Sequence, residues 1–429
     1  MIGTPSKQTL KLAAPFFFTA TALVLPGSYT LMALIPAIVG LYYSRSLPVT
    51  LQWAWNSPSR WSMVGLATYF LGGMLWMVIY GYPLSYFESL LCALLAPLVL
   101  HGLRVLKVSG AAFYMAVALG GVLAGMLSSY QHFVSLHGER AFGAMNNPIM
   151  FGDLSALYGA LALVGVYFLW ERLSVAGRCL LLAGSVGGFW GSLMSGSKGG
   201  WLSIVMVVTM LAWHSSQKLS MARRLKYLAG GVLVLSALFA WAPSSLVKDR
   251  VISGAQGAVT WFETGKVSEG SVSIRLEMWK QSLALIREKP LLGWTAPKAS
   301  AALENRMTLS GNPGFGFTNE NDLLQVTLFH GVVGLTFALM LYGGFIVSFA
   351  KFRKLWPDHE GLTLSGMLVS LMMLEFGLSI SVLGRNAFRY ELITLSVTLL
   401  SILLGKNGPE ESETQGTKTA THISQTTHL

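Results

Sequence analysis

Four charged residues have the types and settings that could act on a substrate carrying a phosphate group. Arg275 stands in the first turn of an expected helix over residues 271–289, where a guanidinium and a helix N-terminus together favour a phosphate. Arg140 and Lys198 stand in two other loops. Glu320 stands just before an apolar segment, where a carboxylate can accept a proton. Such cations would stabilise negative charge on a phosphate group while the carboxylate activates a hydroxyl group.

Two asparagines flank the carboxylate and suggest a substrate rich in hydroxyl groups. The local sequence is Thr318-Asn319-Glu320-Asn321-Asp322, and the amides of Asn319 and Asn321 could hydrogen-bond sugar hydroxyls. The alternative is that Asn321 or Asp322 caps the helix that follows.

Lys198 and two further cations have structural explanations as well as functional ones. Lys198 lies in Ser195-Gly-Ser-Lys198-Gly-Gly200, whose glycines allow backbone N–H groups to approach an anion. Short turns of this kind also simply join helices. Arg385 and Arg389 lie one turn apart at the start of the last expected span, where they either hold an anion or pair with Glu375.

The composition indicates an all-α integral membrane protein. The chain has 429 residues, of which 53% are hydrophobic and 11% charged, whereas a soluble protein carries about twice that share of charge. The net charge of +11 is compatible with nucleic acid binding. Most Lys and Arg lie in short loops between apolar segments, however, which is the pattern of membrane topology. Membrane lipids, and not nucleic acid, are therefore the expected partners.

No metal or other cofactor is expected. Cys92 and Cys179 both fall inside apolar segments and form no ligand motif. The sequence has no Asp-x-Asp pair and no His/Cys cluster of the kind that holds a divalent ion.

The apolar segments predict about twelve membrane-spanning helices. They lie near residues 12–27, 29–44, 61–81, 87–105, 109–130, 150–170, 177–195, 199–214, 227–244, 322–350, 362–384 and 387–405. Residues 1–241 would hold nine spans, 242–322 a long outer loop and 323–405 three more spans. Residues 406–429 would form a disordered cytoplasmic tail.

The distribution of Lys and Arg predicts which side each loop faces. Both termini are expected on the positively charged, cytoplasmic side, and the loop 242–322 on the opposite side. Arg140, Lys198, Arg385 and Arg389 are exceptions that share this opposite side. Several loops that bring cations to one surface suggest an anionic ligand there, although the charges could also be separate and never meet.

The expected helix over 271–289 is amphipathic. Its apolar stripe consists of Leu276, Trp279, Leu283 and Ile286. It is predicted to lie along the outer membrane surface with Trp279 at the depth of the lipid headgroups. In that position Arg275 could alternatively contact lipid phosphates.

Four segments of this sequence together resemble the O-antigen ligase family, within the wider O-antigen ligase/polymerase membrane superfamily. They are Arg140-Ala-Phe-Gly143 with Asn146-Asn147-Pro148; Ser195-Gly-Ser-Lys198-Gly-Gly-Trp-Leu; Arg275-Leu-Glu-Met-Trp279 with Pro290-Leu-Leu-Gly-Trp294; and Asn321-Asp-Leu-Leu-Gln325 with Gly331 and Gly334-Leu335. The order of the segments and the long loop before the tenth span carry the resemblance.

The resemblance implies a fold and an activity. Family members are multi-span, GT-C-like glycosyltransferases of the bacterial inner membrane. They transfer a glycan from undecaprenyl diphosphate to the lipid A–core oligosaccharide at the periplasmic face, with inversion and without a metal. Two positions depart from the family pattern. Glu320 stands where the family has its proposed catalytic His, and Lys198 where it usually has Arg.

Related activities remain alternatives. An O-antigen polymerase or a protein O-oligosaccharyltransferase would use the same donor with a different acceptor. A glycolipid transporter is a more distant alternative, because it predicts charges in mid-membrane and internal repeats. Here most charges lie at the membrane surfaces and no repeat is evident.

Overall fold

The computed structural model describes residues 16–216, 249–268, 271–316 and 318–405, and this part of the chain is helical, without strands. After a short helix at 16–21, the α-helices are α2 (Ser28–Tyr42), α3 (Leu47–Trp55), α4 (Arg60–Tyr80), α5 (Glu88–Val105), α6 (Gly110–Tyr130), α7 (Pro148–Leu169), α8 (Val175–Ser195), α9 (Lys198–Ser216), α11 (Asp249–Thr264), α12 (Ser271–Glu288), α13 (Ala296–Leu309), α14 (Asp322–Leu355), α15 (Glu360–Phe376) and α16 (Asn386–Gly405).

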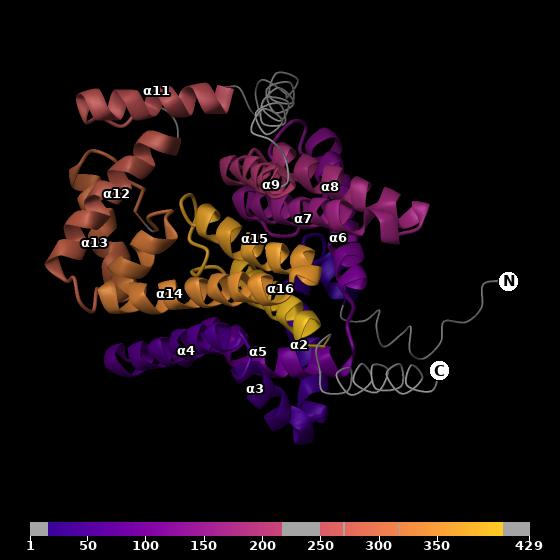
Figure 1. Cartoon of the computed structure of the whole chain (residues 1–429). Coiled ribbons are helices and arrows are strands. Elements are labelled where there is room, and N and C mark those ends of the chain that lie inside the picture. Colours follow the sequence, from indigo (N-terminus) through magenta and orange to yellow (C-terminus); the bar gives the residue numbers. More distant parts are fainter. Residues whose placement is uncertain (1–15, 217–248, 269–270, 317, 406–429) are drawn as a thin grey trace, which may run out of the picture.

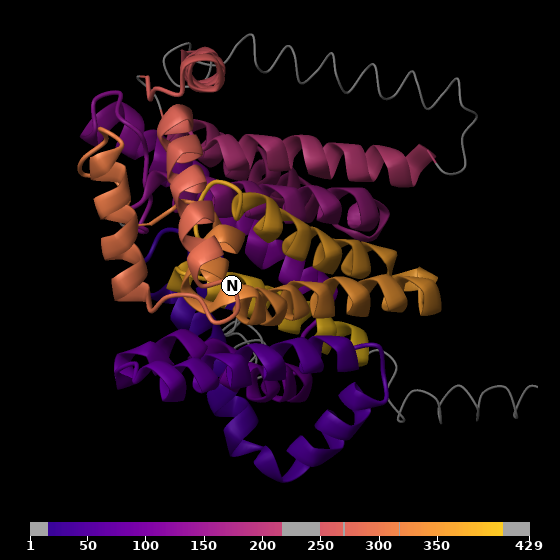
Figure 2. The ribbon, with the colours of Figure 1, turned by 90° about the vertical axis from the view of Figure 1, so that its left-hand side faces the viewer.

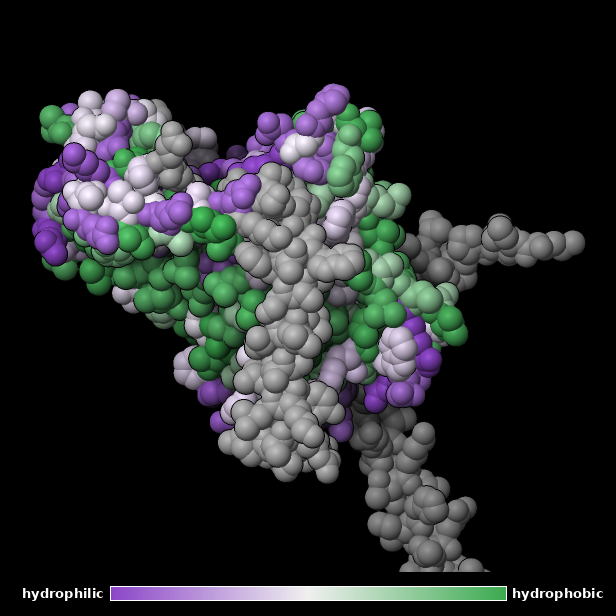
Figure 3. Space-filling model, turned by 90° about the horizontal axis from the view of Figure 1, so that it is seen from above, coloured by the Kyte–Doolittle hydropathy of each residue, from purple (hydrophilic) through white to green (hydrophobic). Residues whose placement is uncertain are grey.

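The length and apolar character of several helices fit a membrane protein, as predicted. Six helical segments could each cross a bilayer, and the pair α2 and α3 with its short linking turn, bent by 82°, could form a seventh. The expected spans at 177–195, 199–214 and 362–384 are represented by α8, α9 and α15, which are not among those six. The described surface has an apolar band with hydrophilic residues at its margins (Figure 3).

Two expected spans and the tail cannot be compared with the structure. The expected span at 227–244, most of the one at 12–27 and the tail 406–429 lie outside the described residues. In the interval 242–322, three helices are described where only one was predicted. They are α11, which includes the glycine-rich run 253–257, then α12 and α13.

The helices form a bundle with an additional group at one end (Figure 1). α14 packs against α4 and α15, and α16 packs against α5. On the other side of α15, helices α6 to α9 pack together. In Figures 1 and 2, α12 and α13 lie next to the beginning of α14, and α11 lies beside α12. The candidate residues of the site come from this end.

Glycines bring α6 and α8 into close contact. A Cβ atom on Gly121 of α6 would lie 2.2 Å from the carbonyl oxygen of Gly184 on α8. A Cβ on Gly187 would lie 2.6 Å from the carbonyl oxygen of Gly121. Small residues at such seams let helix backbones approach where lipid provides no hydrophobic driving force. This packing fixes α7 and α8, which both contribute to the site.

The buried face of α12 differs from the predicted stripe. Ile274, Met278 and Leu285 are the buried apolar residues of α12, whereas Leu283 of the predicted stripe is 47% exposed. The small core that they form also contains Ala299, Leu303 and Met307 of α13 and Leu328 of α14. Contacts with α13 and α14, rather than a flat apolar surface, therefore determine which face of α12 is buried.

A break in α14 anchors the loop that follows α12. Gly331 has φ 64° and ψ −168° inside α14, so the helix is interrupted there. The freed amide of Val332 donates to the carbonyl of Pro290 at 2.8 Å. A Cβ on residue 331 would lie 2.1 Å from the carbonyl oxygen of Leu291. Only glycine fits both the left-handed backbone and this contact.

Candidate functional site

Arg275 of α12 and Glu320 of the segment before α14 lie close enough for their charges to interact. Burial is the main effect on the guanidinium and lowers the pKa of Arg275. The carboxylates of Glu320 and Asp153 lie near enough to raise the same pKa, against the effect of burial. Arg275 is the fifth residue of α12 and thus lies in its second turn.

Glu320 is held in an unusual backbone conformation. Its φ is 51°, in the left-handed region that non-glycine residues seldom occupy. The hydroxyl of Thr318 donates to its Oε1 at 2.7 Å, and Nη2 of Arg385 lies 3.8 Å from the same oxygen. Strained residues of this kind concentrate at functional sites, where the surrounding structure fixes their conformation. The carboxylate is partly exposed and thus accessible to a substrate.

Arg140 is fixed against the break between α8 and α9. Its Nε donates to the carbonyl of Ser195 at 2.7 Å, and the amide of Ala141 donates to Met194 at 3.1 Å. Gln131 supports the same loop, since its Oε1 accepts from the amide of Gly143 at 2.8 Å. The predicted loop and the predicted glycine-rich break are therefore in direct contact.

Asp153 is a site residue that was not identified from the sequence. It lies in α7 and is fully buried. Its Oδ1 accepts hydrogen bonds from the hydroxyl of Ser197 and from the amide of Gly200 at 2.8 Å. Its Oδ2 has no hydrogen-bond partner among the described residues. The carboxylate interacts electrostatically with Arg275 and Arg140, so it links the break before α9 to both arginines.

Lys198 begins α9 and lies against α11. A Cβ on Gly254 of α11 would lie 2.6 Å from the Nζ of Lys198 and 3.1 Å from a methyl group of Val272. The glycine-rich part of α11 therefore provides room for the ammonium group next to the beginning of α12.

The two asparagines beside Glu320 have different roles in the structure. Asn321 is the N-cap of α14, and its Oδ1 accepts from the amide of Leu324 at 3.0 Å. Asn319 is buried, and its Nδ2 has no hydrogen-bond partner in the described part of the chain. Its carbonyl accepts from Nε1 of Trp279 at 2.9 Å. Trp279 thus joins α12 to the Glu320 segment, and Asn319 is the better candidate for contacting a ligand.

The side chain of Asp322 does not cap α14 but accepts a hydrogen bond from the turn that precedes α16. Its Oδ1 accepts from the amide of Leu383 at 2.8 Å, and its Oδ2 accepts from the hydroxyl of Tyr342 at 3.0 Å. Its amide donates to the carbonyl of Gly377 at 2.7 Å. These bonds bring the stretch that carries Arg385 to the beginning of α14.

Arg389 and Glu375 form hydrogen bonds with other residues and not with each other. Glu375 accepts from the hydroxyl of Ser203 at 2.7 Å, and Arg389 donates to the carbonyl of Leu383 and to Oδ1 of Asn386. The alternative in which Arg385 and Arg389 pair with Glu375 is therefore not the arrangement found. Arg385 faces Glu320, whereas Arg389 lines a separate cavity.

The arrangement places cations and an accessible carboxylate in one region, where they could act on the same substrate. Arg275, Arg140 and Lys198 supply positive charge, and Glu320 supplies a proton acceptor or an anchor for a hydroxyl group. In the described ranges, no group of three or more His, Cys, Asp or Glu side chains is placed to hold a metal ion.

Comparison with known families gives one match. Residues 183–339 match the family model described as O-antigen ligase, which confirms the predicted resemblance over this segment. The matched segment contains Lys198, Arg275 and Glu320, whereas Arg140 and Arg385 lie outside it. No curated protein matches the sequence.

Proposed function

We propose that this chain, an O-antigen ligase family protein over residues 183–339, is an O-antigen ligase of the bacterial inner membrane. It would transfer a finished glycan from undecaprenyl diphosphate to the lipid A–core oligosaccharide, at the periplasmic face. The family match supports a membrane glycosyltransferase of the ligase and polymerase type. The observation that carries the proposal further is geometric. The hydrogen bond of 2.9 Å from Trp279 to the backbone carbonyl of Asn319 joins α12, which carries Arg275, to the segment of Glu320, and Arg385 lies 3.8 Å from Glu320.

The proposed reaction is a single displacement at the anomeric carbon of the donor. The acceptor oxygen forms the new glycosidic bond while the bond to the diphosphate oxygen breaks, so the configuration inverts. Glu320 takes the acceptor proton or orients the hydroxyl. Arg275, with Arg140 and Lys198, stabilises the negative charge that develops on the departing diphosphate.

An O-antigen polymerase or a protein O-oligosaccharyltransferase would use the same donor and the same cations. These activities differ in the acceptor, which would be a growing glycan or a protein hydroxyl group. We favour the ligase because the match is to the family described as O-antigen ligase.

Purified protein in liposomes is expected to transfer labelled glycan from undecaprenyl diphosphate to lipid A–core. The assay would compare lipid A–core, an undecaprenyl-diphosphate glycan and a hydroxyl-bearing peptide as acceptors, with product followed by gel mobility and mass. Transfer only to the second or third acceptor would replace the ligase with the polymerase or the protein transferase. Absence of transfer to all three would contradict the proposed function.

The proposed topology places α11 to α13 in the periplasm, because the short loops expected on the same side carry fewer Lys and Arg than those on the opposite side. Cysteine replacing the exposed Lys266 should react with a membrane-impermeant thiol reagent once the outer membrane is permeable. Cysteine replacing the exposed Glu171, beyond the other end of α7, should react only after the inner membrane is broken. Both variants need a Cys179→Ser background, because Cys179 is exposed. The reverse labelling pattern would invert the topology.

A further inference from the structure

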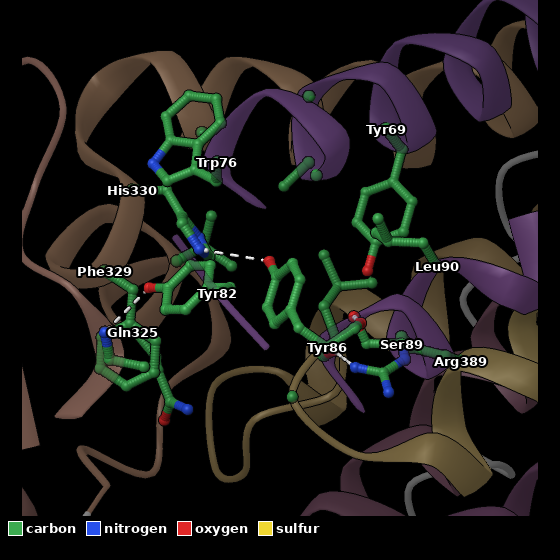
Figure 4. Close-up of a pocket in the computed structure, with 18 of the residues that line it drawn as sticks. Tyr69, Trp76, Tyr82, Tyr86, Ser89, Leu90, Gln325, Phe329, His330 and Arg389 are labelled. Atoms are coloured by element: carbon green, nitrogen blue, oxygen red, sulfur yellow. Dashed lines mark hydrogen bonds between the residues drawn. The ribbon is translucent and has the colours of Figure 1, made fainter. Parts of the chain in front are cut away.

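A cavity of about 510 Å³ lies beside the turn 381–385 and the beginning of α16. Its walls come from α4, residues 82–86, the beginning of α5, residues 296–297, α14, the turn 381–385 and the beginning of α16, segments that are far apart in the sequence (Figure 4). None of the roles proposed above uses this cavity.

Aromatic side chains form much of the cavity wall. The rings of Tyr82 and Tyr86 stack with centroids 4.6 Å apart and planes 22° apart. Trp76, Phe329 and Phe337 also line the cavity. Flat rings that carry hydroxyl groups at one edge suit a ligand with an apolar face and polar edges, such as a pyranose ring.

Two buried polar atoms at the cavity have no partner. Gln325 and Arg389 line the cavity and are only 8% and 6% exposed. The Oε1 of Gln325 and the Nε of Arg389 form no hydrogen bond to any described residue. Buried polar groups are normally satisfied, so these atoms indicate a ligand that supplies both a donor and an acceptor. A sugar hydroxyl does both.

We infer that this cavity binds a pyranose ring of the acceptor glycan, an inference that rests on the proposed glycosyl transfer. A polyprenyl or acyl chain would fit the aromatic wall but would leave Gln325 and Arg389 without partners. A diphosphate would not use the aromatic wall, and other cations are already placed to receive it.

The position of the turn favours the acceptor over the donor glycan. Arg385, which directly precedes α16 and lies four residues before Arg389, is 3.8 Å from Oε1 of Glu320. The second cation near Glu320 is Arg275, which the proposed function assigns to the donor diphosphate. The base must lie within hydrogen-bond reach of the acceptor hydroxyl whose proton it takes. A sugar site bounded by the turn of Arg385, next to Glu320, therefore belongs to the acceptor side.

Gln325→Leu and Tyr82→Leu are expected to raise the acceptor KM roughly tenfold or more, because each removes a hydrogen-bonding group or a stacking face. The donor KM should stay within about twofold of the wild-type value. The assay uses the full-length protein in liposomes, and lipid A–core is supplied at a series of concentrations. Both variants should also bind the delipidated core oligosaccharide more weakly than the wild-type protein does when no donor is present. Met63→Leu, in a separate apolar cavity, is the control for nonspecific packing effects.

Several outcomes would overturn the inference while leaving the proposed function intact. An unchanged acceptor KM in both variants would do so. A rise in the donor KM alone would assign the cavity to the donor glycan. Weaker binding of undecaprenyl phosphate, which carries no sugar, would assign it to the lipid chain.

If Gln325→Leu fails to accumulate, Gln325→Met keeps the length of the side chain and tests the same hydrogen bond. Failure of the wild-type protein to transfer any glycan would instead contradict the proposed function.

Discussion

Glu320→Gln is expected to bind the donor normally and to transfer glycan about 10²–10⁴-fold more slowly, which is the usual contribution of general-base catalysis. The amide keeps the size of the side chain and can still accept the hydrogen bond from Thr318. It loses the proton acceptor and the attraction to Arg385. Donor binding and single-turnover transfer should be measured separately, so that a loss of chemistry is distinguished from a loss of affinity.

Replacement of Glu320 by histidine tests whether the family resemblance extends to the chemistry. Glu320→His should recover part of the lost rate, because neutral imidazole also accepts a proton. That rate should fall as the pH drops below the pKa of the imidazole, since the protonated ring cannot act as a base. Glu263→Gln, which changes an exposed carboxylate of α11, is the matched control.

A structural role for Glu320 makes a different prediction. Its φ of 51° would be relaxed by glycine, which adopts the left-handed region freely. If the carboxylate only anchors the segment, Glu320→Gln should be fully active. If it acts on the substrate, Glu320→Gly should keep its thermal stability and still be nearly inactive. A fully active Glu320→Gln would mean that the base lies elsewhere or is not needed.

The predicted elements that the structure confirms are those with long apolar runs. The helices that begin and end within about two residues of the expected spans are α2, α4, α5, α6, α7, α8, α9 and α16. Long apolar runs favour helices of this kind. α13 was not predicted, although Ala299, Leu303 and Met307 recur at a spacing of four, because the surrounding residues are polar. The stripe on α12 was chosen without knowledge of α13 and α14, and these two helices determine its buried face.

Only the candidate site residues that stand in a recognisable local sequence pattern were predicted. Arg275 was identified from its place near the start of an expected amphipathic helix, and Glu320 from its place just before an apolar segment. Asp153 was missed because it lies inside an apolar run that was interpreted only as a span. An acidic residue at that depth was itself a usable signal, since ionisable groups within spans are seldom without a role. The cavity beside Arg389 could not be predicted, because it is assembled from segments more than 200 residues apart.

Arg275→Lys is expected to lower transfer roughly ten- to a hundredfold while the protein accumulates normally. Lysine keeps the charge but cannot form two parallel hydrogen bonds to a phosphate. The loss of one charge-assisted hydrogen bond corresponds to about 1.5–3 kcal/mol. Arg287→Lys, an exposed arginine on the same helix, is the matched control and should retain full activity. Full activity in Arg275→Lys would reduce Arg275 to a surface charge or a contact for lipid phosphates.

The pH profile of the same variant gives a second readout. Burial lowers the pKa of Arg275, and the carboxylates of Glu320 and Asp153 oppose this effect. An arginine begins from a value above about 12 and remains charged throughout the working range. A lysine at this position begins near about 10.4, and burial acts on it in the same direction. The remaining activity of Arg275→Lys should therefore fall as the pH rises toward the lysine pKa, where the wild-type profile stays flat. Asp153→Asn in this background should make the fall begin at lower pH, because it removes one of the two carboxylates that favour the charged lysine.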